Sequence, residues 1–215
     1  LFDVKSVLTG GFEMGNIWYN EPKSLDVAFD VIGDIVLSAA SQQYGGFTVP
    51  SVDLLLEPYA EKSYEAYLKK YEALGVAKEA AEEESYRDVT RDLEQGFQGW
   101  EYKFNTVASS RGDYPFITVT AGTGTGRFAK LAAITMLQVR RKGQGKAGHK
   151  KPVLFPKIVF LYDENLHGEG KPLEDVFEEG IRCSAKTMYP DWLSLTGKGY
   201  VPGIYKQYGK IISPM

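Results

Sequence analysis

The stretch that decides the fold class lies between residues 115 and 162. It opens with Pro115-Phe116-Ile117-Thr118-Val119-Thr120, a β-branched and aromatic run that predicts a strand. Gly122, Gly124 and Gly126 follow, and the next apolar pattern predicts a helix from about Arg127 to Arg141. Pro156-Lys157-Ile158-Val159-Phe160-Leu161-Tyr162 is a continuous apolar run, typical of a strand buried on both faces. This strand–helix–strand order predicts an α/β fold with parallel strands.

Downstream of this stretch, the pattern predicts one more helix, from about Leu173 to Lys186. Between the helix predicted from Arg127 to Arg141 and the strand that begins at Pro156, residues 142–151 form a basic, glycine-rich loop. Irregular chain is expected beyond residue 186.

The first hundred residues are expected to be mainly helical. Leu1–Val7 predicts a short strand that ends at Gly10-Gly11. A helix begins after Ser24, its expected N-cap, and Gly45-Gly46 ends it. A second helix runs from Pro50-Ser51 to Gly75, and a third from Lys78 to about Phe104.

Composition excludes several classes of protein. The 215 residues carry 25 Lys and Arg against 28 Asp and Glu, a net charge of -3, which argues against a nucleic-acid binder. One cysteine excludes a disulfide framework or a multi-cysteine metal site, and two distant histidines argue against a metal cluster. No apolar run is long enough to span a membrane, and no signal peptide opens the chain. A reducing, cytoplasmic setting is therefore expected.

The segment Gly124-Thr125-Gly126-Arg127-Phe128-Ala129 fits G-x-G-x-x-A between a strand and a helix. That context is typical of a dinucleotide-binding turn, whose helix N-terminus holds a pyrophosphate. The acidic residue expected about twenty positions later is missing, because Lys146 and Lys150 occupy that region. A tight turn made possible by glycine is the favoured interpretation.

Two further features have a functional and a structural interpretation. Six Lys and Arg without an acid, from Arg140 to Lys151, would attract phosphates, but a solvated helix C-terminus explains them as well and is favoured. Cys183 has the basic neighbours Arg182 and Lys186, which lower a thiol pKa, yet a buried structural thiol is favoured.

Asn20-Glu21-Pro22-Lys23-Ser24 begins a helix, so Lys23, the Ser24 hydroxyl and free backbone N–H groups are arranged to receive a phosphate. Ordinary helix capping explains the same residues. Residue-level reasoning therefore predicts an α/β protein with possible phosphate sites and assigns no reaction.

A series of strings carries a family resemblance: Gly11-Phe12-Glu13-Met14-Gly15-Asn16, Pro22-Lys23-Ser24, Gln43-Tyr44-Gly45-Gly46, Glu101-Tyr102-Lys103-Phe104-Asn105-Thr106-Val107, Pro115-Phe116-Ile117-Thr118, Phe155-Pro156-Lys157-Ile158-Val159-Phe160 and Cys183-Ser184-Ala185-Lys186-Thr187-Met188-Tyr189-Pro190-Asp191. In this order they resemble the catalytic subunit of the anaerobic (class III) ribonucleoside-triphosphate reductases. The resemblance covers essentially the whole chain.

The resemblance implies a segment of a ten-stranded α/β barrel of the glycyl-radical type, with a helix-rich first half. It implies reduction of ribonucleoside triphosphates at the 2′ carbon, for DNA synthesis. A radical on a backbone glycine, installed by an S-adenosylmethionine iron–sulfur activase, passes to a cysteine that takes the 3′ hydrogen. ATP and deoxynucleoside triphosphates are the implied allosteric effectors, and a homodimer is the implied assembly.

The same resemblance implies that residues 1–215 are a central segment of the barrel. The thiyl cysteine is expected just after Met215 and a second active-site cysteine just before Leu1, so no catalytic residue is expected within the chain. The glycyl-radical region, its structural zinc site and the ATP-binding regulatory domain are also expected outside it, and the segment alone is expected to be inactive. Cys183 matches neither catalytic cysteine.

Two binding sites are expected from the resemblance. Lys23 falls where the family binds its deoxynucleoside triphosphate effector at the dimer interface, with Glu21 and Ser24 as further contacts. Asn105 and Arg111 are the expected substrate contacts. Two alternatives stay open: another glycyl-radical enzyme of the formate-lyase type, and a non-catalytic nucleotide-binding module.

Overall fold

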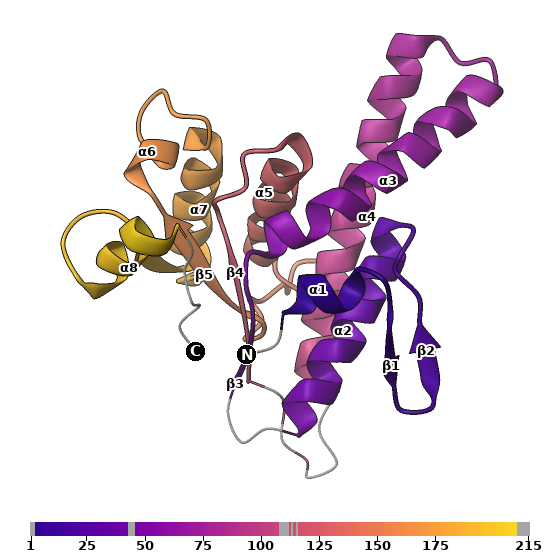
Figure 1. Ribbon diagram of the computed structural model, residues 1–215. Helices are drawn as coiled ribbons and strands as arrows, with labels where there is room; N and C mark the ends of the chain where they lie inside the picture. Colours follow the sequence, from indigo (N-terminus) through magenta and orange to yellow (C-terminus); the bar gives the residue numbers. More distant parts are fainter. Residues whose placement is uncertain (1–2, 43–45, 108–111, 113, 115, 210–215) are drawn as a thin grey trace.

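The computed structural model describes residues 3–42, 46–107, 112, 114 and 116–209. Within these ranges the elements are α1 (Val4–Leu8), β1 (Phe12–Met14), β2 (Ile17–Tyr19), α2 (Leu25–Ser41), β3 (Gly46–Val49), α3 (Val52–Ala73), α4 (Lys78–Thr106), β4 (Phe116–Ala121), α5 (Arg127–Lys142), β5 (Lys157–Tyr162), α6 (Glu164–His167), α7 (Glu174–Thr187), β6 (Asp191–Ser194) and α8 (Tyr200–Tyr208). In Figure 1, α3 and α4 form a long pair whose connected end projects away from the sheet.

A parallel sheet organises the described part of the chain. Strands β3, β4, β5 and β6 pair in chain order, and every pair is parallel. The prediction of an α/β fold with parallel strands is therefore confirmed, and β4 and β5 are the two strands it named. Ile117–Ala121 of β4 and Ile158–Leu161 of β5 are buried, as expected for strands covered on both faces. The sheet is compatible with a segment of a barrel, and the ten-stranded barrel stays a prediction.

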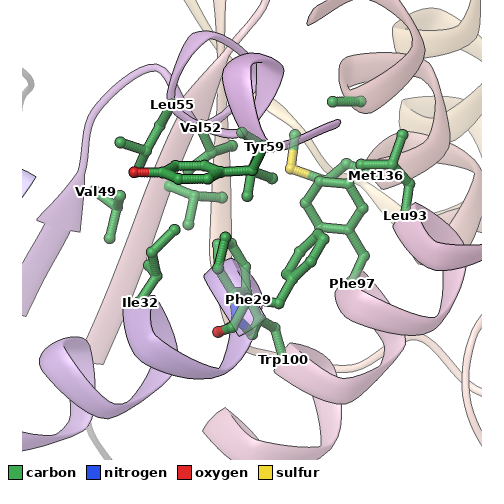
Figure 2. Packing of buried hydrophobic residues seen from close by; sticks show 14 of the residues in the cluster. Phe29, Ile32, Val49, Val52, Leu55, Tyr59, Leu93, Phe97, Trp100 and Met136 are labelled. Atoms are coloured by element: carbon green, nitrogen blue, oxygen red, sulfur yellow. The ribbon is translucent and has the colours of Figure 1, made fainter. Parts of the chain in front are cut away.

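The predicted helices of the first half are confirmed as α2, α3 and α4, which pack together in one hydrophobic core with β3, β4 and α5. Figure 2 shows its aromatic centre, where Phe29 of α2 meets Phe97 and Trp100 of α4. The Phe29 ring lies edge-on to both, with centroids 5.0 Å and 4.9 Å apart. The Trp100 indole N–H also donates to the Phe29 carbonyl at 2.9 Å, so the ring's polar group is satisfied inside the core.

The predicted strand over Leu1–Val7 is wrong where the chain is described: Val4–Leu8 is the helix α1. Leu1 and Phe2 lie outside the described residues. Val4 and Leu8 are four positions apart, so a helix buries both on one face, and a period of two was not the only fit to the pattern. The Asp3 carboxylate caps this helix by accepting from the Ser6 N–H at 3.2 Å and the Ser6 hydroxyl at 2.7 Å.

The expectation of irregular chain after residue 186 is also wrong, because β6 and α8 lie there. The signal for both was weak. Side chains of β6 alternate between half-buried and exposed, and α8 has no fully buried residue. β3 and the hairpin of β1 and β2 were not predicted either, since each strand has only three or four residues.

No helix in the described ranges is both long enough and apolar enough to cross a membrane.

Candidate functional site

A pocket of about 540 Å³ lies at the carboxyl ends of β3, β4 and β5. Ligands of parallel α/β sheets bind preferentially at this edge, where the loops after the strands converge. Apolar side chains form much of its wall, with hydroxyl groups and two charged residues between them. The lining residues are Asp3, Val4, Lys5, Pro50, Ser51, Leu54, Leu55, Thr120, Thr123, Leu161, Leu166, Tyr205 and Gly209.

The connection between β3 and α3 forms part of the lining of this pocket. Ser51 has φ 48° and ψ 56°, a left-handed backbone that turns the chain sharply between the strand and the helix. Its N–H donates to the Thr120 hydroxyl on β4 at 2.8 Å. Because Thr120 is almost fully buried, this bond fixes the start of α3 against the end of β4.

The glycine-rich turn after β4 holds a carboxylate of the protein itself. Asp53 in the first turn of α3 accepts from the Gly122 and Gly124 N–H groups, both at 3.0 Å. A Cβ at Gly126 would overlap the Glu57 carboxylate. Two carboxylates of α3 therefore occupy the place where a pyrophosphate would lie, and the interpretation as a tight turn is confirmed over that as a dinucleotide site.

Burial raises the pKa of the Asp53 carboxyl, while the two N–H groups that donate to this carboxylate lower it.

Gly122 itself has φ 122°, and a Cβ there would lie 3.1 Å from the Leu161 carbonyl oxygen. Glycine is thus required at this position both by the backbone conformation and by the close approach of β5.

His167 holds the same turn from the opposite side. Its Nε2 lies 2.6 Å from the Gly122 carbonyl oxygen, which only accepts, so this nitrogen carries the proton. The Asp163 N–H donates to Nδ1 at 3.0 Å. The ring is 2% exposed and packs among Phe160, Tyr162 and Phe177, and burial lowers the pKa of the imidazole. His167 is therefore neutral in the folded protein near pH 7.

A second, open groove of about 420 Å³ runs between the β1–β2 hairpin and the start of α2. Its lining residues include Trp18, which is 57% exposed, Lys23, and Val27 and Val31 of α2. Glu21 forms an ion pair with Lys62 of α3 at 2.7 Å, and this ammonium group lowers the pKa of the Glu21 carboxyl. Lys62, which no sequence pattern singled out, therefore lies beside Glu21, one of the predicted effector residues.

Ser24 stands at the N-cap position of α2, as predicted, but its hydroxyl donates to the Asp26 carboxylate and caps no backbone N–H. The Leu25 N–H donates instead to the Ser63 hydroxyl of α3 at 2.8 Å. The structure therefore brings Lys23, Glu21 and Ser24 to one edge of the molecule, beside α3.

Comparison with known proteins identifies the family. A family model described as anaerobic ribonucleoside-triphosphate reductase matches residues 1–213. The chain belongs to this family. Among its relatives are anaerobic ribonucleoside-triphosphate reductases of Enterobacteria phage T4, 35% identical over 94% of this chain, and of Haemophilus influenzae, 36% identical over 96%. The Escherichia coli protein of the same name is 34% identical over 96%.

The chain spans 33%, 29% and 28% of the lengths of these three relatives. The match confirms the resemblance to anaerobic ribonucleoside-triphosphate reductases that the sequence strings indicated, and the two alternative protein classes are not favoured.

Neither of the two substrate contacts expected from the resemblance, Asn105 and Arg111, is found at the pocket in the described part of the chain. The Asn105 amide donates to the Glu101 and Phe155 carbonyls, both at 2.6 Å, and accepts from the Phe155 N–H at 3.1 Å. It thereby ties the end of α4 to the segment before β5, away from the pocket at the strand ends. Arg111 lies outside the described residues.

Cys183 is fully buried on α7 of this reductase-family chain, in agreement with its interpretation as a structural thiol. Burial raises its pKa, and its sulfur lies 3.6 Å from the Thr187 hydroxyl. A thiol in this state is a poor nucleophile, and it does not line the pocket at the strand ends.

The interpretation of the basic cluster as a solvated helix end is wrong for its first residue. Arg140 is fully buried and pairs with Glu101 at 2.7 Å. Arg141 and Lys142 pair with Glu179 and Glu94 at the same distance. The acids that neutralise the cluster come from α4 and α7, far away in sequence, so a local count of charges did not reveal them.

Proposed function

We propose that the chain forms part of the catalytic barrel of an anaerobic ribonucleotide reductase, which converts ribonucleoside triphosphates to 2′-deoxyribonucleoside triphosphates in the cytoplasm. Family membership across residues 1–213 supports this proposal. The observation that carries it furthest is the pocket at the carboxyl ends of β3, β4 and β5, the edge at which parallel sheets bind ligands.

In this proposal the pocket forms part of the substrate site. Lys5 is its one lining cation among the described residues and is the contact for the triphosphate. Leu54, Leu55 and Leu161 give an apolar wall suited to a nucleobase or ribose face. Ser51 and Thr123 supply polar groups that fix the orientation of the nucleotide.

The glycyl radical of the family supplies, when present, the hydrogen abstraction that opens the reaction. Nothing in the described ranges fits a role in that step, because Cys183 is buried away from the pocket. The described residues also bring together no three of His, Cys, Asp and Glu that would hold the family's zinc ion. The contribution that we propose for this chain is to bind and orient nucleotides, while the activase, the radical and the zinc belong to the proposal for the whole enzyme.

The groove beside α2 is the proposed effector site. Lys23 is the phosphate contact there, and Glu21 and Ser24 border it. Lys62 is a second cation at the same place, held by Glu21 and by the Pro22 carbonyl at 3.4 Å. A deoxynucleoside triphosphate bound at this edge, beside the projecting helices, would be placed to act between two subunits of a homodimer.

The test compares two single-lysine variants by equilibrium binding to the protein. Lys5→Ala is expected to weaken a ribonucleoside triphosphate such as CTP by about 10- to 100-fold, the worth of one bond to a charged group, and to leave deoxynucleoside triphosphates unaffected. Lys23→Ala is expected to do the opposite. Lys69→Ala removes an exposed cation of α3 and should change neither the affinity for CTP nor that for deoxynucleoside triphosphates. Equal losses in Lys5→Ala and Lys69→Ala would contradict the assignment of the substrate pocket.

A further inference from the structure

Two buried ionisable side chains outside the proposed substrate contacts bind the backbone of one residue, Gly122. The Gly122 N–H donates to Asp53 at 3.0 Å, and the Gly122 carbonyl accepts from His167 at 2.6 Å. Asp53 is 1% exposed and His167 is 2% exposed. The two peptide groups that flank the Gly122 Cα are therefore each held by a side chain that water does not reach.

The residue that this grip positions is Thr123. Asp53 accepts from the N–H on each side of it, at Gly122 and Gly124, with 3.0 Å in both cases. Thr123 lines the pocket at the strand ends. The pocket wall at Thr123 is thus held in place by the hydrogen bonds of Asp53 to the two neighbouring residues.

The two gripping residues are also next to pocket residues in the sequence. Leu54 follows Asp53 on α3, and Leu166 precedes His167 on α6, and both leucines line the pocket. One hydrogen-bonded unit therefore links three separate parts of the pocket wall: the start of α3, the turn after β4 and the helix after β5.

We infer that His167 and Asp53 are positioning residues that fix Thr123 in the pocket wall by clamping the backbone N–H and carbonyl of Gly122. The inference rests on the proposed substrate site and adds the residues that set its shape. Neither side chain touches the nucleotide. Each acts through the turn, so its loss loosens the wall and weakens nucleotide binding.

The experiment has two measurements, on the protein without nucleotide and on nucleotide binding. His167→Leu removes the donor to the Gly122 carbonyl and leaves that carbonyl buried without a partner. Amide hydrogen exchange of Gly122 and Gly124, whose N–H groups donate to Asp53, is expected to accelerate at least tenfold, and the affinity for CTP is expected to fall roughly tenfold. Asp53→Ala is expected to give the same pattern.

Two variants separate positioning from a general loss of stability. His167→Gln keeps an N–H that reaches toward the Gly122 carbonyl and is expected to restore slow exchange and affinity. Val176→Ala removes buried volume from the cluster beside His167 without touching the turn, so it should lower stability and leave the exchange of Gly122 and Gly124 and the CTP affinity unchanged.

Unchanged exchange in His167→Leu would overturn the inference, and so would accelerated exchange with undiminished CTP affinity. Failure of the unaltered protein to bind CTP would overturn the proposed substrate site instead, and the exchange measurement would still decide whether the clamp holds Thr123.

Discussion

Arg140 shows how a single residue joins distant parts of this chain. Its Nε donates to Glu101 of α4 at 2.7 Å and its Nη2 to the Pro156 carbonyl at 2.6 Å. The second Glu101 oxygen accepts from Gln144 at 2.6 Å. Arg140 is fully buried, and its Nη1 has no hydrogen-bond partner among the described residues, so each remaining bond of the guanidinium matters for keeping a charge inside the protein.

Replacing one member of this pair is expected to be costly. Arg140→Leu leaves the Glu101 carboxylate buried without its cation and should lower the free energy of unfolding by about 3–5 kcal/mol in urea denaturation. The double variant Glu101→Leu with Arg140→Met should lose less than Arg140→Leu alone. Arg87→Ala, which breaks exposed pairs with Glu83 and Glu84, should cost less than about 1 kcal/mol. A loss for Arg140→Leu as small as that control would refute the role assigned to the buried pair.

His167 makes stability depend on pH. Burial lowers its pKa in the folded protein, whereas the unfolded chain takes up a proton near pH 6.5. As the pH falls below about 6.5, the unfolded state binds the proton first, so the free energy of unfolding decreases, by at most about 1.4 kcal/mol per pH unit. The carboxylates of Asp163 and Asp53 face the ring and limit this decrease, because they favour the charged imidazole.

The comparison variant is His167→Gln, which has no titrating ring. The difference in unfolding free energy between the unaltered protein and this variant should shrink between pH 7.5 and pH 5.5, measured by urea denaturation. His149 is present in both proteins and cancels. A difference that stays constant with pH would show that His167 is not held neutral.

At the residue scale, local sequence predicted some features and missed others. The buried Cys183 followed from its place in an amphipathic helix, and the glycine turn from three closely spaced glycines. The partners of Arg140 and the carboxylate of Asp53 in that turn could not be predicted, because Glu101 and Asp53 lie 39 and 69 or more positions away in the chain. Only the parallel packing of the elements brings these charges together.

Among the elements, α2 and α4 approach closely because α4 carries glycine at the contact. A Cβ at Gly96 would overlap the Phe29 ring, which Phe97 and Trp100 hold edge-on. Gly99, one turn further along α4, has no atom within 4 Å of an added Cβ. The two glycines therefore form a matched pair for testing the packing of these helices.

Gly96→Ala is expected to destabilise the protein by about 1–3 kcal/mol, because the locked Phe29 ring must move. Gly99→Ala is expected to stabilise it by about 0.5–1 kcal/mol, since alanine favours the helix and meets nothing. Thermal unfolding of both variants gives the comparison. Equal effects would mean that α2 and α4 do not pack through Gly96.

Two of the long helices, α2 and α3, were predictable because their apolar residues repeat over many turns, and α4 because its charged residues pair three and four positions apart. The short elements were not predictable from the sequence. Four residues of β3 or β6 carry too little periodicity to stand out, and the spacing of Val4 and Leu8 fits a helix as well as a strand. What defines these short segments is their pairing: β3 lies beside β4 and β6 beside β5 in the finished sheet.

For the molecule as a whole, the two proposed nucleotide sites lie in different places. The pocket lies at the carboxyl ends of the strands, and the groove with Lys23 lies at the start of α2. Helix α3 borders both, with Asp53 and Leu54 near the pocket and Lys62 near the groove. The family resemblance predicted the residues of the groove. The pocket at the strand ends could be found only from the folded structure, because its lining residues come from five separated segments.

The most direct test of this account maps where each class of nucleotide protects the backbone from hydrogen exchange. A ribonucleoside triphosphate such as CTP should slow exchange at residues 50–55 and 120–124, and a deoxynucleoside triphosphate such as dATP at residues 18–25 and 62–63. Protection by CTP that is absent from the strand ends, or that coincides with the dATP pattern, would contradict the assignment of a substrate pocket to this part of the fold.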